Sequence, residues 1–169
     1  VKSGNAYRCF CTVEELEAER TVAEKAGIAY RYSGRCRALP ESIAPVDEEH
    51  VIRFKVLPGA IDFHDLIRGD VHFEADLIDD FVLLRSDGYP TYHLSVVVDD
   101  IDMAITHVFR GDEHINNTPW QINIFHALGA KLPLFGHCPI ILGEDGLKLS
   151  KRRGAVSVMA YEEMGYLPE

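Results

Sequence analysis

Four cations are concentrated near the end of the sequence, at Lys148, Lys151, Arg152 and Arg153. They stand out because the chain as a whole is acidic, with 17 Lys and Arg against 27 Asp and Glu and a formal net charge of -10. Cationic groups on a glycine-flanked loop, with Ser150 between them, can converge on a polyphosphate, where charged hydrogen bonds are stronger than neutral ones. The alternative is a solvated surface loop, and charge alone favours that alternative.

A second candidate site is the segment Arg110–His114, which follows a predicted strand and precedes a predicted helix. In open α/β sheets, ligands bind in the crevice beyond the carboxyl ends of the strands. Here Arg110 offers a clamp for a carboxylate, Glu113 an acceptor for hydroxyl groups and His114 a ring for stacking. The alternative is an ordinary strand-to-helix loop in which Asp112 and Glu113 stabilise the N-terminus of the helix.

Three of the four cysteines, Cys9, Cys11 and Cys36, lie in the first quarter of the chain. Closely spaced thiolates on a turn are typical of a tetrahedral structural zinc site, which needs a fourth ligand. Tyr32 is an uncommon candidate for that ligand, whereas Ala38, two residues after Cys36, cannot bind a metal. The alternative is a set of reduced cysteines without metal.

The other polar segments predict no site. Asp99–Asp102 lacks the spaced ligands and the glycine of an EF-hand loop, and we interpret it as a solvated turn. The remaining histidines lack metal-binding spacing, so each is interpreted as a surface or hydrogen-bonded residue. Cys138 lies in an apolar stretch, which predicts a core position. The sequence contains no G-x-S-x-G elbow, Walker loop or G-x-G-x-x-G fingerprint.

Composition limits the class of protein that carries these motifs. A chain of 169 residues with 47% hydrophobic content can form one ordinary domain or two small ones, which excludes intrinsic disorder. The acidic balance excludes a protein whose whole surface coats nucleic acid, so any RNA contact must use a local basic patch. The apolar runs are far shorter than the roughly 20 residues of a bilayer span. From these short runs we expect a soluble protein with no membrane partner, and from the small number of cysteines we expect a cytoplasmic one. Because Val1 begins neither a signal peptide nor a Met-initiated chain, we also expect a fragment.

The first half of the chain has an α+β pattern. Thr12 and Glu15 form a capping-box pattern that predicts a helix over residues 13–26, ended by Gly27. Residues 31–37 predict a loop. Short strands are predicted at residues 51–56, 61–63, 71–73 and 81–85, with little indication of a parallel sheet.

The second half has the order strand, turn and helix, which is half of a βαβ unit. A strand is predicted at residues 105–109 and a helix from Thr118-Pro119 to Leu128, ended by Gly129. A further strand at 139–142 leads to the basic loop, and residues 157–164 predict one more short helix.

Together these segments resemble the glutamyl-tRNA synthetases. Lys148-Leu-Ser-Lys-Arg152 is similar to the KMSKS-type loop of class I aminoacyl-tRNA synthetases. The segments before it, at residues 92–100 and 106–119, are also similar to this family, as are residues 6–12, 31–37 and 165–169. The similarity extends over essentially the whole chain, and several motifs in the family's order are far more specific than the loop alone.

The resemblance implies ATP-dependent activation of glutamate to glutamyl-adenylate, with Mg²⁺, and transfer of the glutamyl group to tRNA(Glu) by a monomeric parent enzyme. It implies an α/β fold, the second half of a Rossmann-type catalytic domain with an inserted α+β domain. Residues 1–82 would be the insertion that binds the tRNA acceptor end, and residues 83–143 the second half of the catalytic fold. Residues 144–169 would be the KMSKS-type loop and the start of the stem-contact region.

The family's residue roles transfer to matching positions. Tyr92 and Arg110 would bind glutamate, and Lys148 and Lys151 would be catalytic, holding the triphosphate as pyrophosphate leaves. The residues implied for ATP are Glu113, His114, the backbone of Ile141, Lys148, Ser150 and Lys151. One structural Zn²⁺ is also implied. Some members place a histidine ligand where this chain has Ala38, whereas related enzymes use a tyrosine before the last cysteine, as at Tyr32.

Two features depart from the pattern of this family, and several other functional interpretations remain. The sequence has no His-x-Gly-His motif, so we expect half an active site that is inactive alone, and the resemblance implies an anticodon-binding region that these 169 residues do not include. The nearest rival is the glutamyl-queuosine tRNA(Asp) synthetase, which glutamylates a modified base. Glutaminyl-tRNA synthetases and a non-catalytic tRNA-binding module are further alternatives. Arg152 and the Glu113–Asn117 stretch favour the glutamyl-tRNA synthetases.

Overall fold

The computed structural model describes residues 1–40, 49–74 and 78–140, together with residues 142, 146, 159, 162, 165 and 166. The basic loop and most of the helix predicted at 157–164 lie outside these residues. Among the residues described, no helix is both long and apolar enough to cross a membrane.

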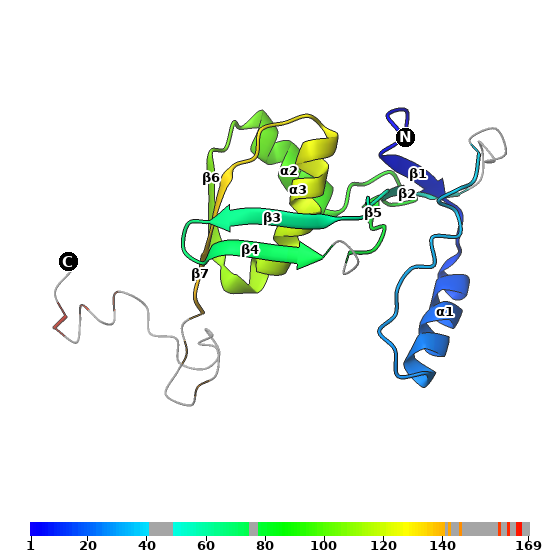
Figure 1. Cartoon of the computed structure of the whole chain (residues 1–169), viewed down its shortest axis with the longest axis horizontal. Helices are drawn as coiled ribbons and strands as arrows, with labels where there is room; N and C mark the ends of the chain where they lie inside the picture. The colour runs from blue at the N-terminus through cyan, green and yellow to red at the C-terminus, as the bar shows by residue number, and fades with distance from the viewer. Residues whose placement is uncertain are drawn as a thin grey trace.

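The described strands form two sheets, which Figure 1 shows end to end. The first is antiparallel, in the order β1 (Ala6–Cys9), β2 (Val51–Phe54) and β5 (Val82–Leu84). The second has the order β4-β3-β7-β6. Its members are β3 (Ala60–Asp65), β4 (Gly69–Glu74), β6 (His107–Gly111) and β7 (Leu134–Cys138).

The second sheet joins an antiparallel hairpin to a parallel pair. β3 and β4 form the hairpin, and β7 runs parallel to both β3 and β6. The connection from β6 to β7 consists of the 3₁₀ helix η2 (Asp112–Asn117) and α3 (Thr118–Ala127). Strands from both sides of residue 82 therefore share one sheet, and the carboxyl ends of β3, β6 and β7 lie at the same edge.

Helix α1 (Val13–Lys25) begins at the predicted capping box. The Thr12 side chain accepts a hydrogen bond from the Glu15 amide at 3.3 Å, and the Glu15 carboxylate accepts one from the Thr12 amide at 2.9 Å. No residue of α1 is buried, and Figure 1 shows the helix standing apart from both sheets. The local caps, and not a packed face, therefore define its start.

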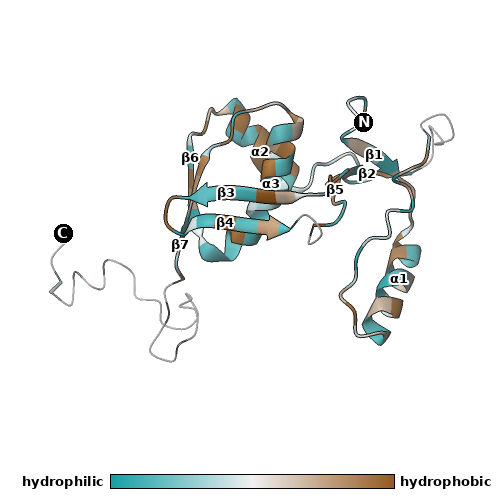
Figure 2. Cartoon of the chain, viewed as in Figure 1, coloured by the Kyte–Doolittle hydropathy of each residue, from teal (hydrophilic) through white to brown (hydrophobic). Residues whose placement is uncertain are grey.

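The main core lies between α2 (Tyr92–Asp102), α3 and the strands beside them. Its buried members are Phe54, Val56, Ile78, Val97, Ile124 and Phe125. Hydrophobic residues concentrate on α2 and α3 in Figure 2. Because Phe54 belongs to β2 and Ile61, which packs against the cluster, belongs to β3, one core serves both sheets.

The solvated turn predicted at Asp99–Asp102 is wrong, because these residues form the last turn of α2. Leu94, Val97 and Ile101 recur at helical spacing and pack in the core, whereas Asp99 and Asp102 are exposed and Asp100 is half-buried.

The strand predicted at residues 139–142 is wrong at Pro139 and Ile140, which lie outside any strand, while Ile141 lies outside the described residues. The strand is β7, five residues earlier, where Leu134–Cys138 pair in register with His107–Gly111. Proline lacks an N–H group, and Pro139 directly follows the last paired residue. Cys138 is the exposed last residue of the strand, which corrects its predicted core position.

Candidate active-site edge and cysteine cluster

Arg110 lies at the carboxyl end of β6, in register with His137 on the neighbouring strand β7. Paired residues of adjacent strands project to the same face, so the two side chains meet. Arg110 Nε donates to His137 Nε2 at 3.0 Å, and Nη2 donates to the hydroxyl of Thr118 at 2.8 Å. Arg110 also lies 5.9 Å from the centroid of the Phe135 ring. The guanidinium is thus fixed at a sheet edge of the kind where ligands bind.

Burial lowers the pKa of Arg110, whereas Tyr92, Asp100 and Asp65 act in the opposite direction. An arginine retains its charge under such perturbation because its ordinary pKa is so high. Tyr92 is the first residue of α2, and its side chain is 54% exposed. The structure therefore brings the two residues implied for glutamate binding close together, with the cation on the buried side.

Glu113 and His114 lie in η2, directly after β6. Glu113 folds back over Gly111, where an added Cβ would lie 2.3 Å from its Oε2, so a side chain at position 111 would displace the Glu113 carboxylate. His114 Nδ1 lies 3.2 Å from Nδ2 of Asn117. Both predicted ATP contacts are thus at the same sheet edge as Arg110.

Behind Arg110 lies a buried pair that sequence reasoning missed. His137 Nδ1 lies 2.6 Å from Asp65 Oδ2, and neither side chain has any exposed surface. The two residues are 72 positions apart, on β7 and at the end of β3. Nothing in the sequence indicates that these two residues pair, although the position of Asp65 just before a turn is typical of a side chain that caps backbone amides.

The three N-terminal cysteines converge with Tyr32. The sulfurs of Cys9, Cys11 and Cys36 all lie within 4.8 Å of one another. The Tyr32 hydroxyl lies 3.2 Å from Cys9 Sγ and 3.5 Å from Cys11 Sγ. Three converging sulfurs suit Zn²⁺, and the Tyr32 oxygen beside two of them is an uncommon candidate for the fourth position. The residues present fit the metal.

Electrostatics in this cluster are uneven. Burial raises the pKa of Cys9, but hydrogen bonds from Tyr32 and the charge of Arg53 outweigh it, and the net shift is downward. Burial raises the pKa of Cys11 to about 11. The guanidinium of Arg53 lies 3.9 Å from the centroid of the Tyr32 ring. Cys9, with this cation beside it, becomes a thiolate more readily than Cys11 does.

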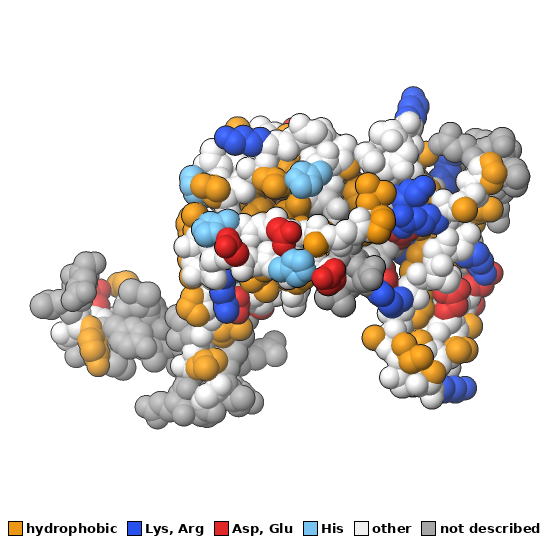
Figure 3. All heavy atoms as spheres, in the orientation of Figure 1, with side chains coloured by type: hydrophobic (Ala, Val, Ile, Leu, Met, Phe, Trp, Pro, Cys, Tyr) orange, Lys and Arg blue, Asp and Glu red, His pale blue; other side chains and the backbone are white. Residues whose placement is uncertain are grey.

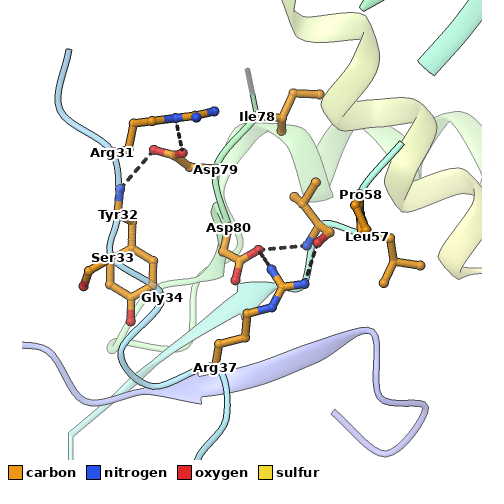
Figure 4. A pocket seen from close by; sticks show the side chains of 11 residues that line it. Arg31, Tyr32, Ser33, Gly34, Arg37, Leu57, Pro58, Ile78, Asp79 and Asp80 are labelled. Carbon is orange, nitrogen blue, oxygen red and sulfur yellow. Dashed lines mark hydrogen bonds and ion pairs between the residues drawn. The ribbon is translucent and has the colours of Figure 1, made fainter. Parts of the chain in front are cut away.

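Two adjacent aspartates attach the loop of residues 31–37 to the body of the protein, beside a pocket of about 370 Å³ (Figure 4). Asp79 pairs with Arg31 at 3.2 Å and accepts the Tyr32 amide at 3.0 Å. Asp80 accepts from Arg37 at 2.6 Å, and Arg37 also donates to the carbonyl of Val56. This loop carries Cys36 and Tyr32, so the aspartates help to position the cluster that these residues form with Cys9 and Cys11.

The remaining predicted site residues lie outside the part of the chain that the structure describes. They are Ile141, Lys148, Ser150, Lys151 and their neighbours Arg152 and Arg153.

Residues 1–169 match the family model of class I tRNA synthetases (E and Q), catalytic domain. The chain belongs to this family, and its mixed α/β fold is that of the family's catalytic domain.

Several curated relatives are glutamate–tRNA ligases. The chain is 57% identical to the glutamate–tRNA ligase of Aquifex aeolicus and 54% identical to that of Syntrophotalea carbinolica. All of this chain is covered, but only 37% and 36% of those two proteins. The glutamate–tRNA synthetase structure from Elizabethkingia anophelis is similar with a TM-score of 0.80 and 36% identity, covering 98% of this chain and 34% of that one. The chain is thus a homologue of part of the glutamate–tRNA ligase catalytic domain.

Proposed function

We propose that the protein to which this chain belongs activates glutamate with ATP and ligates it to tRNA(Glu). The observation that carries the proposal is the position of Arg110, a half-buried cation fixed by two side chains at the carboxyl end of a parallel strand pair. A guanidinium there can bind a substrate carboxylate with paired hydrogen bonds. The high sequence identity with glutamate–tRNA ligases supports glutamate as that substrate.

In this proposal Tyr92 and Arg110 bind glutamate, so that its reacting carboxylate meets the α-phosphate of ATP. Positioning of the two substrates supplies much of the acceleration in such a reaction. ATP, bound with Mg²⁺, lies against Glu113, His114 and the backbone of Ile141. Lys148, Ser150 and Lys151 bind its triphosphate, and the lysines stabilise the charge that develops on pyrophosphate.

We assign the acceptor end of tRNA to residues 1–82, the second half of a Rossmann-type fold to residues 83–143 and the stem-contact region to residues 144–169. Cations gather over β1, β2 and the loop beside them in Figure 3. A hollow of about 340 Å³ there is lined by Lys2, Arg8, Arg37 and Lys55. No carboxylate occurs among its described lining residues. This is the local basic patch that an acidic protein needs to contact RNA phosphates.

Cys9, Cys11, Cys36 and Tyr32 would hold one Zn²⁺. The metal would supply folding energy and no reaction chemistry, because a four-coordinate site leaves no open position for substrate. Its effect would be to fix residues 31–37, of which Arg37 lines the basic hollow.

The test is ATP–pyrophosphate exchange followed by tRNA charging, with an enzyme that contains this chain. We expect exchange that depends on glutamate and charging of tRNA(Glu). Charging of tRNA(Asp) or of glutamine would instead favour the two related synthetases, and tRNA binding without exchange would favour a non-catalytic module. The chain of residues 1–169 by itself should show no exchange, because it has no His-x-Gly-His motif.

A further inference from the structure

Two Asp–His pairs that involve strand β3 share one geometry but differ in environment. Asp62 Oδ1 lies 2.6 Å from His72 Nδ1, and Asp65 Oδ2 lies 2.6 Å from His137 Nδ1. The first pair is exposed, on the face of β3 and β4 where acidic and histidine side chains alternate in Figure 3. The second pair is fully buried. A surface pair contributes little to stability. A buried pair has a desolvation cost that a further hydrogen-bond partner must offset.

That partner is Arg110, and it fixes the proton on His137. The Nε of an arginine always carries hydrogen and can only donate. Since Arg110 Nε lies 3.0 Å from His137 Nε2, the imidazole must present a lone pair there. The ring is therefore neutral, with its proton on Nδ1, where Asp65 accepts it. A proton on Nε2 would set two donors against each other away from water, and a ring protonated on both nitrogens would also place a second cation beside the guanidinium.

The carboxylate that selects this tautomer is itself fixed by the backbone. Oδ1 of Asp65 accepts the amides of Ile67, Arg68 and His137 at 3.0, 2.9 and 3.1 Å. Burial raises the pKa of Asp65, but the hydrogen bonds from the Arg68 amide and the His137 ring outweigh it and lower the pKa to about 2. Asp65 is thus an anion whose orientation the hairpin turn determines.

We propose that Asp65 and His137 are positioning residues that hold the guanidinium of Arg110 in the orientation in which it binds a substrate carboxylate. The inference rests on the proposed function, which gives Arg110 that ligand. Arginine has many rotamers, and ordering its side chain at the moment of binding would weaken affinity. Hydrogen bonds at Nε and Nη2 fix two of the three nitrogens of the planar guanidinium. The direction of the third nitrogen is therefore fixed as well.

The first test is Asp65→Asn in an enzyme that contains this chain. The carbonyl of asparagine can replace Oδ1 toward the backbone amides, which turns its NH₂ group toward His137 Nδ1. His137 must then carry its proton on Nε2, opposite the Arg110 donor. In ATP–pyrophosphate exchange we expect the KM for glutamate to rise about tenfold or more, as for a buried donor left without an acceptor. The KM for ATP should stay within about twofold, because the defect is confined to the carboxylate clamp.

Asp62→Asn is the matched control, since it makes the same change on the same strand in an exposed pair of the same geometry. It should alter neither KM. A second readout is the two-bond ¹H–¹⁵N spectrum of enzyme labelled at histidine, which distinguishes the two tautomers. We expect the Nδ1–H form of His137 in the parent enzyme and the Nε2–H form in Asp65→Asn.

Substitutions of His137 provide an independent test if Asp65→Asn does not fold. Glutamine can extend an acceptor oxygen toward Arg110, whereas the shorter asparagine cannot. We therefore expect His137→Gln to retain a lower KM for glutamate than His137→Asn, with similar melting temperatures for the two variants.

Several results would overturn the inference. One is an unchanged KM for glutamate in Asp65→Asn while Arg110→Lys raises it, and another is equal behaviour of the two His137 variants. A parallel loss of glutamate and ATP binding with a lower Tm would indicate a folding role only. An unchanged KM for glutamate in Arg110→Lys would instead refute the ligand assigned to Arg110 under the proposed function, and the inference with it.

Discussion

Asp80 and its neighbour Asp79 both pair with an arginine of the loop at residues 31–37, and they allow the contribution of burial to be measured. Asp80 is 6% exposed and accepts three hydrogen bonds, from Arg37 at 2.6 Å, the Tyr7 hydroxyl at 2.8 Å and the Val56 amide at 2.9 Å. Asp80→Asn keeps the shape but removes the charge and half of the acceptor capacity. Hydrogen bonds to charged groups each contribute about 1.5–3 kcal/mol, and Arg37 can recover part of this from water.

We therefore expect Asp80→Asn to lower the free energy of unfolding by about 2–3 kcal/mol. For a chain of this size, that is a decrease in Tm of roughly 5–10 °C. Asp79→Asn is the control, because the Asp79 and Arg31 side chains are 36% and 50% exposed. An exposed ion pair contributes about 0.2–1 kcal/mol, so this variant should lose no more than that.

The assay is urea unfolding followed by circular dichroism, with the slope m compared between variants. Equal losses in Asp79→Asn and Asp80→Asn at unchanged m would refute the reasoning, since burial would then make no difference. A change in m for Asp80→Asn would show instead that the substitution altered compactness, which the hydrogen bonds alone do not predict.

Three further predictions follow from the sites. Tyr32→Phe should bind zinc at least about tenfold more weakly in chelator competition, because it removes a ligand, whereas Ser33→Ala should match the parent; equal affinities would exclude Tyr32 as the fourth ligand. Lys151→Ala should lower kcat for adenylate formation about a hundredfold with a modest change in the KM for ATP, while Arg153→Ala is tolerated; equal losses, or an effect on ATP binding alone, would return the basic cluster to a solvated loop. The pKa of Asp65, lowered to about 2, means that the unfolded chain binds the proton more readily, so about 2 kcal/mol of stability present above pH 4 should be lost as the pH falls toward 2. Asp65→Asn should remove this part of the acid dependence, and an unchanged pH profile of unfolding would contradict the assignment.

The elements that short-range chemistry determines were predictable from sequence. Thr12 and Glu15 define the start of α1, and Thr118-Pro119 begins α3, each through groups within one helical turn. The convergence of Cys9, Cys11 and Cys36 was predicted from residue type, although Cys36 lies 25 residues after Cys11, and the structure places the Tyr32 hydroxyl beside two of the three sulfurs.

What escaped prediction depends on pairing between distant strands. β7 is buried at its centre and lacks the alternation of an exposed strand, so the apolar residues after Pro139 gave the stronger signal. That misplacement put His137 outside any strand and hid its register with Arg110. Asp65 was missed because its side-chain partner, His137, lies on a strand 72 residues later.

The same separation has a consequence for folding kinetics. A contact between residues 65 and 137 closes a long loop, and the entropy of that closure must be overcome before the contact contributes any stability. Local units such as the β3–β4 hairpin can form within microseconds, whereas the pairing of β3 with β7 raises the contact order and must await the β6–α3–β7 crossover. We therefore expect the Asp65–His137 hydrogen bond to have a φ-value near zero. During synthesis, the guanidinium of Arg110 would acquire its anchor only after β7 has left the ribosome, so the proposed glutamate site would be among the last of the described parts to mature.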